Sequence, residues 1–220
     1  MSFEFLRNNL MHVAPILIAG VLAAAIMIER CRTLFVKYAL KNPTQFLDQI
    51  TNFTIQGKLK EAVTLCGEAP QVPLVELVKG ALLRAHEPEE FVLGRMEILL
   101  GEMSQRIQKR TSYLATLANV STLLGLLGTI AGLIQSFEAV AHADAQQKAA
   151  LLANGISTAM NATLLGLAVA IPCMVAFSFL VNRSNFLIKQ LEGTALQMID
   201  AIRRSGTSSV ESVVSEEKAS

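Results

Sequence analysis

The sequence has few of the residue types that build enzyme active sites and metal sites. Its 220 residues include no tryptophan, two tyrosines, three cysteines and three histidines. The cysteines are widely spaced, without a C-x-x-C pair or a neighbouring histidine, which predicts neither a disulfide framework nor a zinc site. No phosphate-binding loop and no nucleophile with a histidine base at a recognisable spacing is present. We therefore expect no enzyme activity, no metal and no cofactor.

Charge is absent from two long stretches of the chain. Residues 111–137 and 149–182 contain no Asp, Glu, Lys or Arg. At about 1.5 Å of rise per helical residue, each stretch can cross a hydrocarbon core of roughly 30 Å. A third apolar stretch, residues 10–28, is just long enough for one crossing. We predict an all-α membrane protein with three transmembrane helices, two of them long and extended into the cytoplasm, and a small cytoplasmic helical bundle.

The first apolar stretch has two interpretations. Arg7 supplies one basic residue before it, and the run Ala23–Ala25 resembles a signal-peptide cleavage site, which would give a mature chain beginning near Ile26. The apolar residues outlast that site and continue to Ile28. This continuation favours an uncleaved membrane anchor.

The basic residues are unevenly distributed around the predicted spans. Lys and Arg are concentrated after the first span, before the second and after the third. Because basic residues resist translocation, we expect the N-terminus outside the cytoplasm and the C-terminus inside it. The predicted segments are a periplasmic N-terminus (1–9), spans at 10–28, 111–141 and 151–182, a cytoplasmic helical region (29–110), a periplasmic loop (142–150), a cytoplasmic helix extension (183–204) and a disordered tail (205–220).

Within residues 29–110, apolar residues recur at helical spacing. Pro43 favours a helix start and Gly57 a helix end, with further short helices from Leu59 to Cys66 and from Val72 to Arg84. From Pro88 an amphipathic pattern continues into the second span without a turn signal, which predicts one helix of about fifty residues. Its apolar side is predicted to hold Phe91, Leu93, Met96, Leu99, Leu100, Met103 and Ile107. Beyond the third span the apolar period continues through Phe186, Leu187, Leu191, Leu196, Ile199 and Ile202.

The uncharged spans contain hydroxyl and amide side chains that membrane insertion does not require. Thr122, Thr129 and Ser136 recur at heptad spacing on one line of a helix. Nearby glycines, Gly125, Gly128 and Gly132, are typical of close helix packing in lipid, which is the simplest explanation of the pattern. The alternative is a row of hydroxyls that solvates a passing cation.

The third span contains Thr158, Asn161 and Thr163, and Pro172 lies farther along it. An amide inside a membrane is costly without a partner, so Asn161 is expected at a helix interface or a wet cavity. Pro172 removes a backbone donor and predicts a kink or hinge. Glu138, at the edge of the second span, is an ordinary solvated carboxylate or a proton relay.

Two blocks of sequence resemble the MotA/TolQ/ExbB proton-channel family, especially its TolQ and ExbB branch. They are LLGLLGTIAGLIQSF, residues 123–137, and LANGISTAMNATLLGLAVAIP, residues 152–172. The resemblance implies a homopentamer around two copies of a single-span partner of the ExbD/TolR type, whose membrane Asp carries the proton. It places Thr129 and Thr163 at the family's pore threonines and Pro172 at its A-I-P element. The partner would thus supply the acid that these spans lack.

The sequence departs from the family pattern at two of its polar positions. The family usually has a Glu where Thr158 stands and an apolar residue where Asn161 stands. Hydroxyl and amide oxygens suit a hard cation, which keeps sodium open beside the proton. We expect an ion-conducting stator subunit that uses the ion gradient to power envelope transport of the TonB or Tol-Pal type, or gliding motility, through an ion pathway of Thr129, Thr163, Thr158 and Asn161. The alternative is a non-conducting scaffold that anchors a cytoplasmic bundle.

Overall fold

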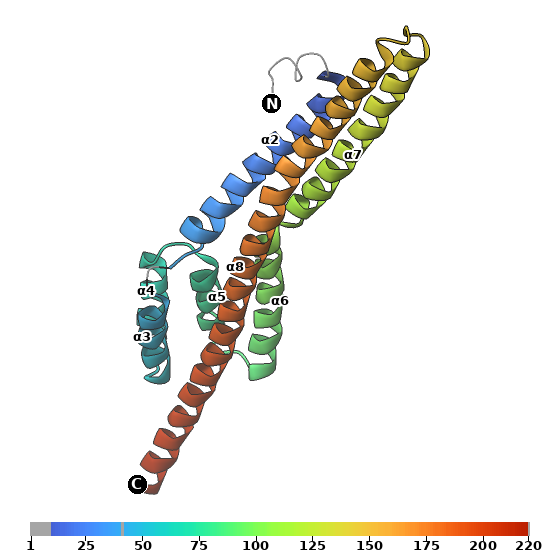
Figure 1. Ribbon diagram of the computed structural model, residues 1–220. Coiled ribbons are helices and arrows are strands. Elements are labelled where there is room, and N and C mark those ends of the chain that lie inside the picture. Colours follow the sequence, from blue (N-terminus) through green and yellow to red (C-terminus); the bar gives the residue numbers. More distant parts are fainter. Residues whose placement is uncertain (1–9, 41, 220) are drawn as a thin grey trace. The chain divides into compact units, whose positions relative to one another are not determined.

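The computed structural model describes residues 10–40 and 42–219, and all its regular elements are helices (Figure 1). Three segments in this part of the chain are long and apolar enough to cross a membrane, Val13–Lys37, Glu89–Ala141 and Lys148–Ser205. The prediction of an all-α protein with three spans is therefore confirmed. The elements are α2 (Leu10–Arg32), the π-helix η1 (Thr33–Lys37), α3 (Pro43–Ile55), α4 (Leu59–Glu68), α5 (Pro73–Leu82), α6 (Glu89–Gln108), α7 (Ser112–Ala141) and α8 (Lys148–Ala219).

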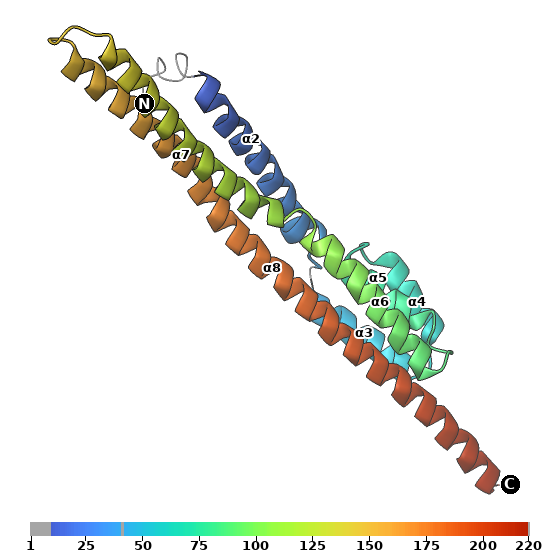
Figure 2. The same ribbon diagram turned by 90° about the vertical axis from the view of Figure 1, so that its right-hand side faces the viewer.

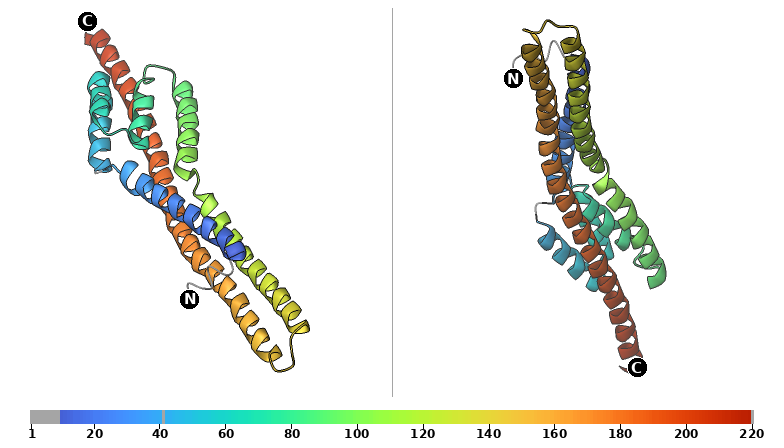
Figure 3. Two further views of the ribbon diagram at one scale, coloured as in Figure 1. Left: turned by 90° about the horizontal axis from the view of Figure 1, so that it is seen from above. Right: turned by 45° about the vertical axis from the view of Figure 1, so that its right-hand side comes forward.

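The described residues divide into two compact units. The first contains residues 10–31 and 110–181, and the second contains residues 32–109, without residue 41, and 182–219. In the first unit, α7 and the beginning of α8 form an antiparallel hairpin, and α2 lies beside it (Figures 1 and 2). Residues 142–147 connect the two helices of the hairpin, as the additional views show (Figure 3). This hairpin contains both uncharged stretches.

The second unit contains the short helices, which pack on one another in the order of the chain. α3 contacts α4, α4 contacts α5, and α5 contacts α6. Pro43 is in the first turn of α3, and Gly57 follows that helix with a φ of 73°, a conformation that costs glycine little. In α5, which lies within the helix predicted from Val72 to Arg84, Leu74, Leu77, Val78 and Leu82 recur at helical spacing and are all buried. The helical periodicity of residues 43–82 therefore identified the core of these elements.

Within the second unit, α8 buries a stripe of residues spaced three and four apart. The stripe contains Ser184, Leu187, Leu191, Thr194, Ala195, Met198 and Ala201. Phe186 and Leu196, which the sequence placed on the apolar side, are exposed by 58% and 68%. The predicted Leu187 and Leu191 are in the buried stripe, whereas the stripe also contains smaller residues such as Thr194 and Ala195 that hydrophobicity alone does not select.

The predicted helix of about fifty residues from Pro88 is wrong, because it is interrupted. α6 ends at Gln108 and α7 begins at Ser112. Between them Lys109 has a ψ of 133° and Arg110 a φ of 63°, neither of which is helical. No glycine or proline marks this break in the sequence. Farther up α6, Phe91 and Leu93 are exposed, whereas Val92 is buried beside the predicted Met96, Met103 and Ile107.

The end of the chain also differs from the prediction. α8 continues as one helix through Ala219, where the sequence predicts a disordered tail from residue 205. The stretch contains no proline and only one glycine, so nothing in it stops a helix that is already formed. Low hydrophobicity argues against burial and does not by itself end a helix.

Candidate functional site

The centre of the first unit is a contact between small residues of α7 and α8. A Cβ added to Gly125 would lie 3.3 Å from the Cα atoms of Thr163 and Gly166, and one added to Gly128 would lie 2.7 Å from the Cβ of Ala162. A Cβ on Gly132 would lie 3.3 Å from Ala159. The two backbones approach closely because the contacting positions have little or no side chain. We call this contact the glycine seam; it comprises Ser121, Gly125, Gly128, Gly132 and Ser136 of α7 and Gly155, Ala159, Ala162 and Gly166 of α8.

The sequence indicated the α7 side of the glycine seam but missed the α8 side. Gly155, Ala159, Ala162 and Gly166 follow one another at intervals of four, three and four residues, which is the spacing of one helical face. Their spacing was a usable signal.

The hydroxyls of α7 do not form one continuous row. Thr122 donates a hydrogen bond to the carbonyl oxygen of Ala118, Thr129 to that of Leu126 and Ser136 to that of Gly132. Ser136 is buried in the glycine seam, where its side chain occupies the space next to Gly155. Thr129 is only half-buried. The heptad pattern thus combines a packing residue, Ser136, with two threonines that lie beside the seam.

On α8 the three predicted residues lie on two different sides of the glycine seam. Thr163 follows the seam residue Ala162 by one position, whereas Thr158 and Asn161 each precede a seam residue, Ala159 and Ala162, by one position. One residue corresponds to about 100° of rotation, so these positions flank the seam in opposite directions. Thr163 and the pair Thr158 and Asn161 therefore do not share a surface.

Thr129 lies on the same side of the hairpin as Thr163. It follows the seam residue Gly128 by one position, as Thr163 follows Ala162. In a pair of antiparallel right-handed helices, the residue one position after a contact residue lies on the same side of the pair in both helices. The residue one position before a contact residue lies on the other side. Thr122, which follows Ser121, lies on that side too. Thr163 is additionally tied to α7, because its Oγ1 is 3.5 Å from the carbonyl oxygen of Gly125, at the long limit for a hydrogen bond.

The opposite side of the hairpin faces α2. A Cβ added to Gly20 of α2 would lie 3.2 Å from the Cγ2 of Val169. Val169 follows Thr158 by eleven positions, which is close to three turns, so the two residues lie on one face of α8. Thr158 and Asn161 are half-buried and make no hydrogen bond within the described part of the chain. Within the first unit, the side with Thr122, Thr129 and Thr163 is the one that α2 does not cover.

The remaining predicted residues lie away from the threonine side. α8 continues without interruption through Pro172. Glu138 is exposed near the end of α7, and its backbone carbonyl oxygen is 3.0 Å from the Nδ1 of His142. Among the described residues, no three His, Cys, Asp or Glu side chains are grouped so that they could hold a metal ion. The side chains of Thr122, Thr129 and Thr163 thus offer neutral oxygens in stretches that contain no acidic or basic residue.

The sequence pattern of the MotA/TolQ/ExbB proton channel family matches residues 70–193, more than half of the chain. The matched region contains the whole glycine seam and all the threonines beside it. It also includes α5, α6 and the part of α8 that reaches into the second unit. The match therefore extends well beyond the two uncharged stretches that suggested the resemblance.

Individual relatives agree with this family match. The chain is 32% identical over 176 residues to the Tol-Pal system protein TolQ of Haemophilus influenzae, covering 76% of each chain. It is 30% identical over 182 residues to a putative biopolymer transport protein ExbB homolog of Methanothermobacter thermautotrophicus, covering 82% of this chain and 62% of the relative. It is 32% identical over 113 residues to the biopolymer transport protein ExbB of Pseudomonas putida, covering 51% of this chain and 32% of the relative.

Proposed function

Because the chain belongs to the MotA/TolQ/ExbB proton channel family, we propose that it is the channel subunit of an inner-membrane energy-transducing complex. The family is one of transport proteins and not of enzymes, and three apolar helices agree with a multi-pass membrane protein. The relatives named TolQ and ExbB support a role in a Tol-Pal or TonB-type system. The subunit lets protons cross the membrane and converts their flow into movement of a partner.

One observation carries this proposal. Thr129 and Thr163 come from different helices and flank the glycine seam on the side that α2 leaves open. Their hydroxyls lie in stretches without any acidic or basic residue. Threonine hydroxyls can form hydrogen bonds with a protonatable group, but they do not themselves ionise near neutral pH. A pathway lined by Thr129 and Thr163 therefore requires a carboxylic acid from a second protein.

The proposed partner is a single-span protein of the ExbD/TolR type with an Asp in its span. The open threonine side of several hairpins would surround it, which fits a homo-oligomer and, by family resemblance, a pentamer. We place the N-terminus in the periplasm and the C-terminus in the cytoplasm, with residues 29–110 on the cytoplasmic side of the membrane. Moving one charge through 100 mV releases about 2.3 kcal/mol, so several protons per step would bias a rotation.

The proposal is tested by ion flux through the reconstituted complex. The chain and its single-span partner are placed in vesicles that contain a pH-sensitive dye, and a proton gradient is applied. Thr129→Val and Thr163→Val should each lower the flux by about tenfold or more, because a hydrogen bond to a charged group contributes roughly 1.5–3 kcal/mol. Thr116→Val is the matched control, because Thr116 is an exposed threonine of α7 whose hydroxyl bonds to its own helix.

The flux experiment also separates the alternatives. Unchanged flux in both valine variants, with the oligomer intact by size-exclusion chromatography, would contradict the threonine pathway. Absence of any flux in the wild-type complex would favour a non-conducting scaffold that anchors the short helices. Repeating the assay without sodium and then without a pH gradient distinguishes a proton from a sodium pathway. Envelope-integrity and motility phenotypes of a deletion strain then distinguish Tol-Pal, TonB and gliding systems.

A further inference from the structure

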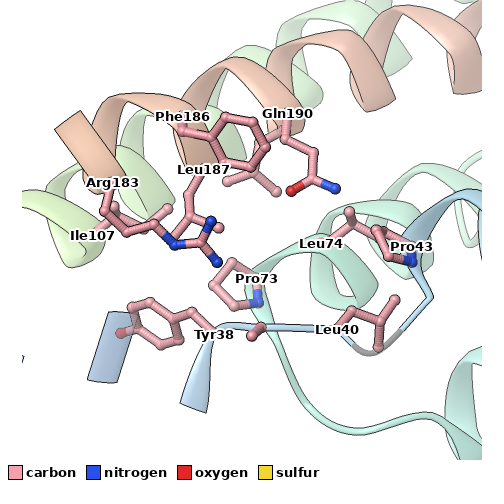
Figure 4. A pocket seen from close by; sticks show the side chains of 12 residues that line it. Tyr38, Leu40, Pro43, Pro73, Leu74, Ile107, Arg183, Phe186, Leu187 and Gln190 are labelled. Atoms are coloured by element: carbon pink, nitrogen blue, oxygen red, sulfur yellow. The ribbon is translucent and has the colours of Figure 1, made fainter. Parts of the chain in front are cut away.

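A pocket in the second unit contains a cationic side chain that has no anionic partner. The pocket has a volume of about 140 Å³. Its walls come from the segment between η1 and α3, from the start of α5, from the end of α6 and from α8, and they include Leu40, Pro73, Leu74 and Leu187. Figure 4 shows the guanidinium group of Arg183 and the amide group of Gln190 pointing from α8 toward the space beside Pro73. The pocket is thus largely apolar, with the guanidinium group of Arg183 and the amide group of Gln190 on the wall formed by α8.

Arg183 is held in place by aromatic rings. Its guanidinium carbon lies 5.2 Å from the ring centroid of Phe35 and 5.3 Å from that of Phe186. Cation–π contacts of this kind fix the plane of the guanidinium group but leave its N–H donors free. The Nε atom is buried and has no acceptor among the described residues. Arg183 is therefore oriented without being neutralised.

Arg183 has no carboxylate partner among the residues that the structure describes. None of the residues that line the pocket is acidic, and Arg183 forms no salt bridge in the described part of the chain. In the same unit Arg106 pairs with Glu76, and Arg203 and Arg204 pair with Asp200. A partly buried charge without a counter-charge is costly, so an anion bound beside Arg183 would reduce that cost.

The position of Arg183 along α8 indicates the source of the anion. It directly follows Asn182, the last residue of the uncharged stretch, so it lies where the third span leaves the hydrocarbon core. The other α8 residues of the pocket, from Phe186 to Leu191, follow within about 12 Å of helix. This is the depth of the lipid headgroups. A soluble anion would gain nothing from the apolar walls, whereas a lipid would cover them.

We propose that this pocket binds the phosphate group of an anionic membrane lipid. The guanidinium group of Arg183 donates to the phosphate oxygens in the paired geometry that arginine favours, and the amide of Gln190 donates a further hydrogen bond. The apolar walls accept the glycerol and the first methylene groups of the chains. Such binding does not depend on ion flow, so the lipid site can be tested independently of the proposed channel function.

The absence of tryptophan makes a direct test possible. The full-length Phe186→Trp variant carries the only tryptophan of the chain, next to the pocket, and indole preserves the cation–π contact with Arg183. The variant is reconstituted in phosphatidylcholine vesicles containing increasing fractions of phosphatidylglycerol with brominated chains, and quenching of the fluorescence is recorded. Adding Arg183→Gln should raise the half-saturating fraction of phosphatidylglycerol about tenfold. Lys189→Gln, which removes an exposed charge of α8 outside the pocket, should leave it unchanged.

Three results would overturn the proposal. Equal quenching by brominated phosphatidylcholine and phosphatidylglycerol would mean that the pocket does not distinguish anionic lipid. Equal loss of preference in Arg183→Gln and Lys189→Gln would indicate general surface charge. Abolition of the preference by excess inorganic phosphate would assign the site to a soluble phosphate and not to a lipid. Phe179→Trp, in the apolar part of α8 and exposed by 69%, reports bulk lipid and should show no preference in any background.

Discussion

The Nη1 atom of Arg110 lies 2.8 and 2.9 Å from the two carboxylate oxygens of Glu29. The contact joins the end of α2 to the residue that interrupts the helix between α6 and α7. Arg110 has a φ of 63°, which an L residue adopts only at a cost of about 1 kcal/mol or more. The ion pair compensates part of that cost.

Breaking this pair should destabilise the first unit slightly. Both side chains are 48% exposed, so Glu29→Gln should lower the free energy of unfolding by no more than about 1 kcal/mol. Thermal unfolding followed by circular dichroism measures the effect, with Glu61→Gln as the control, because Glu61 is exposed and forms no ion pair with any described residue. A double-mutant cycle with Arg110→Gln should give a coupling of about 0.2–1 kcal/mol. Zero coupling would show that the pair does not fix the break.

A methyl group in the glycine seam should be strongly destabilising. A Cβ on Gly166 would lie 2.6 Å from the backbone oxygen of Ser121 and 3.0 Å from the Cα of Gly125, and backbone atoms cannot move aside. Gly166→Ala should cost about 1–3 kcal/mol in unfolding and lower the yield of oligomer. Gly193→Ala is the matched control on the same helix, because no atom lies within 4 Å of its added Cβ. Alanine there should stabilise by up to about 1 kcal/mol, so equal behaviour of the two variants would refute the seam.

Thr158 and Asn161 should affect ion flux much less than Thr163 does. They lie on the side of α8 that faces α2, so Thr158→Val should change flux in the reconstituted complex by less than about twofold. Asn161→Leu should behave similarly and change mainly the thermal stability. A tenfold loss of flux in Thr158→Val would place this side in the pathway and would require a pore on both sides of the hairpin.

Cys31 and Cys66 should differ in their reaction with maleimide. Burial raises the pKa of the Cys66 thiol to about 11, and the positive charge of Lys79 opposes this only in part. At pH 8 roughly a thousandth of Cys66 would be thiolate, so its labelling should lag far behind that of the exposed Cys31. Mass spectrometry of the labelled peptides measures each rate, and the two rates should converge after denaturation.

The raised pKa of Cys66 also predicts a pH dependence of stability. Folding favours the protonated thiol, so its contribution is fully present below the unfolded pKa of about 8.5 and declines as pH rises toward 11. Cys66→Ser should show a smaller loss of stability over this interval in thermal unfolding. A loss of the same size in both proteins would assign the effect to other groups.

The sequence predicted those features that depend on local pattern. The lengths of the uncharged stretches, the start of α3 at Pro43 and its end at Gly57 follow from residue type and spacing alone. The break at Arg110 and the side on which Thr158 lies do not follow from local pattern. Arg110 pairs with Glu29, far away in the chain, and the side of the hairpin that carries Thr158 is defined by where α2 packs. Both features depend on tertiary contacts that residue type and spacing do not reveal. For the same reason, Thr158 and Thr163 cannot be distinguished by residue type alone.

The short connection between α7 and α8 has a consequence for how the protein enters the membrane. Residues 142–147 contain one acidic residue, Asp144, and no lysine or arginine, so translocating them exposes little charge to lipid. The backbones of the two helices are close enough at the glycine seam to associate without large side chains to interlock. These properties favour insertion of α7 and the start of α8 together, as a preassembled helical hairpin, before any partner is bound. On this view, the threonines reach the bilayer already aligned.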